Sequence, residues 1–216
     1  MIRDVVLTRI NYFLLAVLAL VTAYAFVSVP AGTTIPVHWG VNGQADGFAE
    51  RTAAFLMLPA ISIALVGLVA LIVRAASSAQ IEAGKAGLAV VVSALLVLFV
   101  TMQIGMLLIG LGHPVNMVQI IALGMALLLI VVGNVLPKSQ PNRYSGIRLP
   151  WTMTDPANWR ATHRLVGGLM MLTGALLLVL AFLPVQPLSL FCGLLAAVLV
   201  PIAVGGVYSY RFSKRA

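Results

Sequence analysis

Residues 87–112, GLAVVVSALLVLFVTMQIGMLLIGLG, form an apolar stretch of 26 residues without one charged side chain. Because an α-helix rises 1.5 Å per residue, about 20 such residues cross the ~30 Å hydrocarbon core of a bilayer. Five similar stretches bring the number of apolar segments to six, at residues 10–29, 53–73, 87–112, 115–136, 165–184 and 188–208. A buried helix of a soluble protein could mimic one of them, but not six within 216 residues. The sequence therefore predicts an all-α polytopic membrane protein with six transmembrane helices.

The composition supports this class. Charged residues make up 8% of the chain and hydrophobic residues 62%, whereas a soluble domain carries roughly 25% charged residues. A water-soluble globular protein is therefore excluded. The single cysteine, Cys192, lies in the last apolar stretch and can form neither an internal disulfide nor a cysteine-based zinc site. We expect a packed thiol there and no cofactor.

The positive charges are distributed unevenly over the connections between the apolar stretches. Of the 13 lysines and arginines, all but Arg51 lie in the N-terminal segment, in residues 74–86, in residues 137–164 or after Tyr210. Cytoplasmic connections of membrane proteins are enriched in Lys and Arg, so both termini and these two connections are predicted to be cytoplasmic. The net charge of +8 is explained by the positive residues at the cytoplasmic helix ends. The chain has no basic run and no recognition helix, so no direct contact with nucleic acid is expected.

The spacing of the apolar stretches divides the chain into two three-helix halves, residues 1–112 and 113–216. The first half contains a long outward connection at 30–52, and the second contains a long cytoplasmic connection at 137–164. Three spans are an odd number, so the second half enters the membrane from the opposite side, as in the 3+3 inverted repeats of transporters. The residues of the two halves match poorly, so a chance similarity of spacing stays open.

The outward connection contains a strand-like segment, TTIPVHW at 33–39. Two turn sequences follow it, Asn42-Gly43 and Asp46-Gly47. Glycine supplies the positive φ that such turns require. We therefore expect a short strand followed by two turns.

The outward connection also carries the residue types of a weak metal site, a histidine and two carboxylates, at His38, Asp46 and Glu50. Their spacing matches no strong metal-binding motif, and a solvated loop is far commoner. No metal is therefore expected. We expect His38, Trp39 and Asp46 to be the binding residues of the outward surface.

The cytoplasmic connection begins as extended chain and ends as a helix. Pro141 and Pro150 favour extended backbone. Thr154 or Asp155 can then cap a helix whose first turn holds Pro156. We expect this helix to continue into the fifth membrane span.

Two interpretations account for the polar side chains of this helix, where Trp159 and His163 share one face and Arg160 and Arg164 share another. In the first, the tryptophans lie at headgroup level and the arginines contact lipid phosphates; composition favours this interpretation. In the second, the connection binds an acidic or phosphate group of a cytoplasmic partner. The candidate binding residues are Asn142, Arg148, Trp151, Asp155, Trp159, Arg160, His163 and Arg164.

Polar residues are few within the predicted spans, and none is charged. The amide of Gln103 would be costly in lipid, so we expect it to form a hydrogen bond with another helix. Asn134 is the second intramembrane polar candidate. We expect Gly167, Gly168 and Gly174 to allow close packing of the fifth helix.

Sequence signatures of enzymes are absent. The chain has no His-Glu-x-x-His motif, no nucleophile elbow and no pair of aspartates at membrane depth. His38 and His163 are predicted on opposite sides of the membrane and cannot contribute to one site. No catalytic residue and no enzymatic activity are therefore predicted.

The two long connections resemble those of a known family. The segment at 133–168, GNVLPKSQPNRYSGIRLPWTMTDPANWRATHRLVGG, resembles the SdpI family of bacterial membrane proteins. The segment at 35–48, IPVHWGVNGQADGF, resembles the N-terminal domain of unknown function often fused in that family. The matching residues are Gly133-Asn134, Pro137, Pro141-Asn142, Gly146-Ile147-Arg148, Pro150-Trp151-Thr152, Trp159 and Thr162-His163-Arg164, together with Pro36, His38-Trp39, Gly43, Asp46 and Gly47. The resemblance implies a six-span protein of the bacterial plasma membrane.

The resemblance also implies a function, which is protection of the producing cell against a membrane-active peptide toxin. The member that names the family signals the presence of toxin by holding a transcriptional repressor at the membrane. A cytoplasmic repressor or another protein is therefore a candidate partner, beside the toxin and membrane lipids.

Two alternatives stay open. A transporter or flippase of a small or lipid-like substrate would fit the inverted-repeat spacing, and a polar central cavity would favour it. A membrane enzyme acting on a phosphate-bearing lipid would use Arg148, Arg160, His163 and Arg164, and one pocket lined by these four side chains would favour it.

Overall fold

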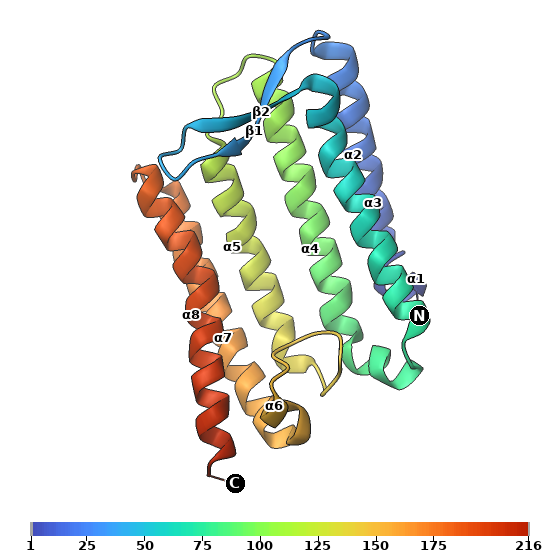
Figure 1. The fold of residues 1–216 in the computed structure, drawn as a ribbon, viewed down its shortest axis with the longest axis vertical. Helices are drawn as coiled ribbons and strands as arrows, with labels where there is room; N and C mark the ends of the chain where they lie inside the picture. Colours follow the sequence, from blue (N-terminus) through green and yellow to red (C-terminus); the bar gives the residue numbers. More distant parts are fainter. Residues whose placement is uncertain (1, 216) are drawn as a thin grey trace.

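A computed structural model describes residues 2–215, and six long helices dominate it (Figure 1). These helices are α2 (Arg9–Ser28), α3 (Arg51–Ala75), α4 (Ser78–Gly110), α5 (Met117–Val135), α7 (Pro156–Phe182) and α8 (Pro187–Ser213). Within residues 2–215, six helices are long and apolar enough to cross a membrane. The predicted all-α polytopic architecture with six spans is confirmed.

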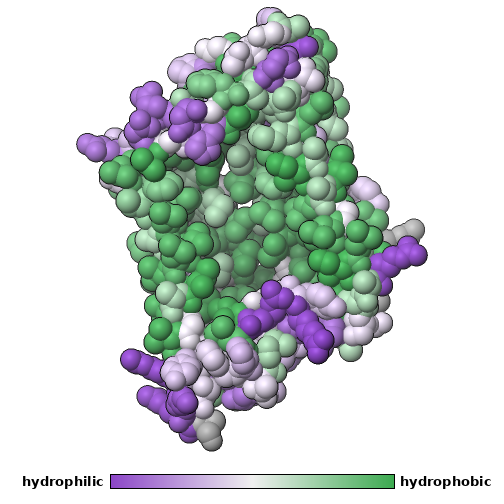
Figure 2. Space-filling view, in the orientation of Figure 1, coloured by the Kyte–Doolittle hydropathy of each residue, from purple (hydrophilic) through white to green (hydrophobic). Residues whose placement is uncertain are grey.

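Shorter elements lie at the two ends of the bundle. At one end, β1 (Thr34–Trp39) and β2 (Ala45–Glu50) form an antiparallel hairpin within the outward connection. At the other end lie α1 (Ile2–Val5), the 3₁₀ turn η1 (Leu136–Lys138), α6 (Pro150–Thr154) and the last turn of α8 (Figure 1). Figure 2 shows a hydrophobic middle between these two more hydrophilic ends. We call the hairpin end outward and the other end cytoplasmic, following the charge rule.

The helices pack in two groups of three. Helix α2 contacts α3 and α4, whereas α5 contacts α7 and α8. Contacts between α4 and α5 join the two groups. The division of the chain into two halves and the inverted repeat stay predictions.

The amide of Gln103 links three helices of the first group. Its side chain is fully buried, and Nε2 donates to Thr22 Oγ1 and to the Phe55 carbonyl oxygen, both at 2.9 Å. The expected hydrogen bond to another helix is therefore present. Asn134 differs, because it is exposed on the last turn of α5. The sequence also missed Asn11, which is fully buried and accepts from Ser93 Oγ at 2.7 Å.

Helices α5 and α7 approach closely at glycines. A Cβ on Gly167 would lie 2.5 Å from the Gly133 carbonyl oxygen, and one on Gly174 would lie 2.9 Å from the Ala126 carbonyl oxygen. The expectation of close packing holds at these two positions. It is wrong for Gly168, which is exposed and would place a Cβ in open space.

The hairpin contains one of the two expected turns. Asn42-Gly43 lies in the turn at 40–44, where Gly43 has φ +78°. The turn expected at Asp46-Gly47 is wrong, because both residues belong to β2. Gly47 pairs with His38, and a Cβ there would lie 2.8 Å from His38 Cβ. Glycine is required at this position because the two strands lie too close for a side chain opposite His38, and not because of a positive φ.

The adjacent glycines of α7 provide a matched test of the packing. Gly167→Ala should destabilise the protein by about 1–3 kcal/mol, because the new methyl group collides with α5 backbone. Gly168→Ala should be neutral or slightly stabilising, since alanine is favoured by about 0.5–1 kcal/mol in a helix interior. Thermal unfolding of both variants in the same detergent measures the difference. Equal melting temperatures would contradict the packing described here.

Candidate functional site

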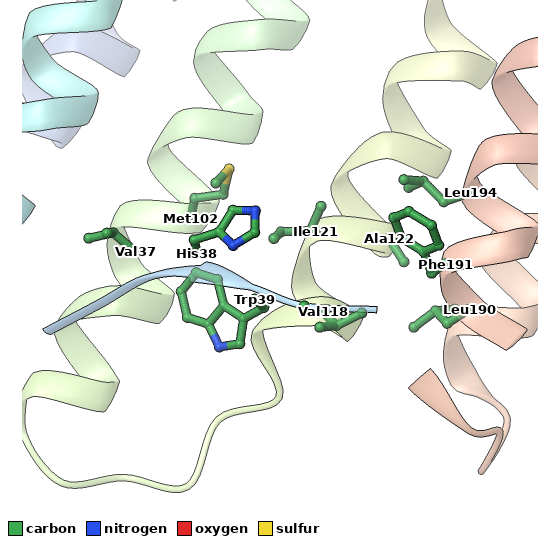
Figure 3. A pocket seen from close by; sticks show the side chains of 11 residues that line it. Val37, His38, Trp39, Met102, Val118, Ile121, Ala122, Leu190, Phe191 and Leu194 are labelled. Atoms are coloured by element: carbon green, nitrogen blue, oxygen red, sulfur yellow. The ribbon is translucent and has the colours of Figure 1, made fainter. Parts of the chain in front are cut away.

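The outward hairpin covers an apolar cavity of about 310 Å³. In Figure 3 strand β1 crosses the cavity and brings His38 and Trp39 to it. The helices contribute Met102 from α4, Val118, Ile121 and Ala122 from α5, and Leu190, Phe191 and Leu194 from α8. The lining is therefore mostly aliphatic, aromatic and thioether groups, contributed by both groups of helices. Such a cavity fits an apolar group that arrives from outside.

The tip of the hairpin contacts the first turn of α8. A Cβ on Gly43 would lie 2.7 Å from Pro187 Cγ. Glycine is therefore needed here both for its positive φ and for space. Through this contact a segment of the first half touches the second half beside the cavity.

His38 and Asp46 form an exposed pair on the hairpin. His38 Nδ1 lies 2.5 Å from Asp46 Oδ1, and the side chains are 72% and 53% exposed. A pair this exposed contributes under about 1 kcal/mol to stability. Among residues 2–215, no three His, Cys, Asp or Glu side chains cluster so as to hold a metal ion.

Glu50, grouped with His38 and Asp46 in the sequence, instead caps α3. Its carboxylate accepts the Thr52 N–H at 2.8 Å. The N–H and hydroxyl of Thr52 favour the charged carboxylate and thereby lower the pKa of Glu50. Glu50 thus fixes the junction between the hairpin and α3.

Arg51, the exception to the charge rule, is engaged with helix α2. Its guanidinium donates to the carbonyl oxygens of Val29 at 2.7 Å and Phe26 at 3.3 Å. These carbonyls end α2, where the helix dipole favours a cation. The outward arginine therefore connects the end of α2 to the start of α3.

His163 and Trp159 form the centre of the cytoplasmic connection. Both are fully buried, and their rings stack with centroids 3.9 Å apart. His163 Nε2 accepts the Ile147 N–H at 2.9 Å, so the ring is neutral and Nδ1 donates to the Trp159 carbonyl oxygen at 2.8 Å. Gly146, at φ +103°, packs against this ring where a Cβ would collide with it. The shared helix face of Trp159 and His163 thus holds residues 146–147 in place.

Asn142 holds the preceding segment against α4. It is fully buried, and its Oδ1 accepts the N–H groups of Tyr144 at 2.9 Å and Ser145 at 2.8 Å. A Cβ on Gly84 of α4 would lie 2.8 Å from this oxygen. The Arg143 N–H donates to Gln80 Oε1 on the same helix at 3.0 Å. Residues 139–146 are therefore packed on α4 rather than loose in solvent.

Helix α8 holds the last part of the connection through Ser209. Trp151 Nε1 donates to Ser209 Oγ at 2.8 Å, and Asn158 Nδ2 donates to the Ser209 carbonyl oxygen at 2.9 Å. Asp155 caps α7 as predicted, since its Oδ1 accepts the Ala157 N–H at 2.7 Å. The helix continues into the fifth span, as expected.

The structure separates the eight cytoplasmic candidates into two sets. Asn142, Trp159 and His163 are buried, and Trp151 and Asp155 are half-buried and engaged with neighbouring residues. Arg148, Arg160 and Arg164 are exposed. Arg148 donates to the Arg143 carbonyl oxygen. A partner can touch the arginines directly, whereas the buried set can act only by holding the surface.

Sequence reasoning missed several residues of this network. Thr152 is fully buried, accepts the Leu149 N–H at 2.9 Å and donates to the Ile147 carbonyl oxygen at 2.7 Å. Its place in the Pro150-Trp151-Thr152 motif was the available signal. Asn158 and Ser209 lie 51 residues apart, so no local pattern could have paired them.

Comparison with known proteins agrees with this division of the chain. Residues 138–209 match the SdpI/YfhL protein family, and residues 13–63 match the domain of unknown function DUF1648. The resemblance to the SdpI family is confirmed. The chain is 26% identical over 181 residues to the immunity protein SdpI of Bacillus subtilis strain 168, covering 84% of each protein. No solved structure matches the chain.

The region that matches the SdpI/YfhL family therefore contains the His163 network, Ser209 and the exposed arginines, while the region that matches DUF1648 contains the whole hairpin. With six apolar helices, the chain is a multi-pass protein of the bacterial plasma membrane. Five of the matching residues in the region that matches the SdpI/YfhL family, Asn142, Thr152, Trp159, Thr162 and His163, are buried inside the protein. These buried residues hold the cytoplasmic connection in shape and are not themselves accessible to a partner.

Replacing His163 tests this internal role. His163→Phe should release the cytoplasmic connection, because a buried N–H without an acceptor costs about 1–3 kcal/mol. Trypsin should cleave after Arg143 and Arg148 several-fold faster in nanodiscs containing this variant. His113→Phe, at an exposed histidine of the opposite end, should cleave at the wild-type rate. Unchanged cleavage of His163→Phe would contradict the role assigned to the imidazole.

Proposed function

We propose that the protein protects its cell against a membrane-active peptide toxin and that the outward cavity receives an apolar part of that toxin. The cavity beneath the hairpin is the observation that carries this proposal. Its volume of about 310 Å³ lies at the lower end of the roughly 300–1,000 Å³ range of ligand pockets. The similarity to an immunity protein supports the same function.

The position and chemistry of the cavity suit such a ligand. It lies under the hairpin, at the end that meets molecules arriving from outside, and its lining is apolar. Burying one large apolar side chain there would contribute roughly 1.5–3 kcal/mol of binding free energy. Trp39 and the His38–Asp46 pair at the rim provide aromatic and polar groups for the rest of the peptide.

A cytoplasmic signal is the second part of the proposal, and α8 is the element that would carry it. The outward end of α8 lines the cavity through Leu190, Phe191 and Leu194. Its cytoplasmic end holds Trp151 and Asn158 through Ser209. Displacement of α8 by a bound toxin would therefore move the segment that carries Arg148. The exposed arginines Arg148, Arg160 and Arg164 would then present a changed surface to an acidic cytoplasmic partner.

The two alternatives have less support. The middle of the first helix group is closed by Gln103 and its partners rather than opened by a polar cavity, and the outward cavity is apolar, which does not favour a polar transport path. Arg148, Arg160, His163 and Arg164 do not line one common cavity among those described, and both ring nitrogens of His163 are engaged. These observations favour binding over transport or catalysis.

Filling the cavity tests toxin binding. Leu194→Trp places a larger side chain in the cavity and should abolish protection, whereas Leu195→Trp, on the exposed face of α8, should retain it. Survival of a sensitive bacterium expressing each variant would be measured against a panel of membrane-permeabilising peptides. Equal membrane levels would be checked by immunoblot. Full protection by Leu194→Trp would exclude the cavity as the binding site.

Removing the Ser209 hydroxyl tests the coupling. In wild-type nanodiscs, a peptide against which the protein protects should change the rate of trypsin cleavage after Arg148. Ser209→Ala should keep protection but lose at least half of that change, because Trp151 loses its acceptor on α8. Ser213→Ala removes an exposed hydroxyl bonded only to the Tyr210 carbonyl oxygen and should respond like wild type. A normal response of Ser209→Ala would show that α8 does not act through Trp151.

A further inference from the structure

The cytoplasmic end of α8 carries three positively charged residues, Arg211, Lys214 and Arg215. Residues 156–215 contain five Lys and Arg residues and no Asp or Glu. Arg211, in the last turn of α8, and Arg215, in the turn that follows the helix, are both exposed and line one hollow. Neither faces an acidic side chain within that part of the sequence.

An apolar groove leads along the membrane face of α8 to these arginines. It has a volume of about 420 Å³ and is lined by Leu165 of α7 and by Ala203, Val204, Val207, Tyr208 and Arg211 of α8. A second hollow of about 410 Å³ is lined by Tyr208, Arg211, Phe212 and Arg215. Because Tyr208 and Arg211 line both, the two hollows form one surface that is apolar along its length and cationic at its cytoplasmic end.

We propose that this surface, from Leu165 and Val204 to Arg215, binds an anionic phospholipid of the cytoplasmic leaflet. The guanidinium groups of Arg211 and Arg215 bind the phosphate, since Arg matches phosphate oxygens with paired donors. The Tyr208 ring lies between them and the groove, at the headgroup level where tyrosine is enriched. An acyl chain occupies the groove beside Val204 and Val207.

Charge and position together select this occupant. Basic residues near a membrane surface that contains anionic lipids contribute attraction to those lipids. Val204 is 41% exposed and Val207 is 55% exposed, on a helix that meets hydrocarbon rather than water. A soluble phosphate compound would contact only the arginines and would leave the apolar groove empty. Ser209, which holds Trp151, is buried on another side of α8, so the lipid site is separate from the proposed signalling contact.

Native mass spectrometry of delipidated full-length protein tests the proposal. Dioleoylphosphatidylglycerol and dioleoylphosphatidylethanolamine would be added separately at equal concentrations. Wild-type protein should retain phosphatidylglycerol at least tenfold more tightly, and Arg211→Gln/Arg215→Gln should lose about tenfold of that affinity. Lys138→Gln/Arg143→Gln removes the same charge at the same end and should keep it. Equal binding of both lipids, or an equal loss in the control, would overturn the site.

A second pair of variants separates the groove from the charges. Ala203→Trp fills the groove and should weaken phosphatidylglycerol binding, whereas Ala196→Trp, at another exposed position of α8, should not. Glycerol phosphate and a ten-residue polyglutamate peptide would be tested as competitors. Displacement of the lipid by glycerol phosphate at similar concentration would reduce the site to a headgroup contact. Displacement by the peptide would assign the arginines to an acidic protein, and either result would overturn the proposal. Thermal unfolding of each variant confirms that it is folded.

Discussion

The neutral imidazole of His163 organises the cytoplasmic end of the molecule, because it accepts the Ile147 N–H while stacked on Trp159. Irregular backbone that is buried must find hydrogen-bond partners within the protein, since each lost bond is costly. His163, Asn142 and Thr152 supply those partners from side chains. The connection can therefore hold a fixed shape without regular secondary structure, and Arg148 is placed by that shape.

The sequence predicts the spans well and the network poorly, for physical reasons. Lipid tolerates only long apolar helices, so hydropathy alone identifies the spans. Because an unpaired amide is costly in lipid, the sequence also predicts that Gln103 forms a hydrogen bond with another helix. Helical spacing shows that Trp159 and His163 share a face, but it does not show whether that face points to water or to α5 and η1. The errors at Gly47 and Gly168 have one cause, since local sequence does not reveal what lies opposite a glycine.

Charge is used differently at the two ends. At the outward end, the guanidinium of Arg51 donates to the carbonyl oxygens that end α2. The hairpin carries little net charge, and the cavity beneath it is apolar. Inside, several arginines stay exposed around a buried polar network. The outward end is therefore suited to apolar contact and the cytoplasmic end to acidic groups, and α8 reaches both.

The contact between Ser209 and the cytoplasmic connection also sets an order of events during synthesis. The ribosome completes α4 and residues 137–149 well before it makes α8. Trp151 and Asn158 thus lack these acceptors until Ser209 has been translated. In a chain that stops before α8, Trp151 and Asn158 would therefore lack this anchor, while residues 143 and 147 would keep theirs on α4 and α7.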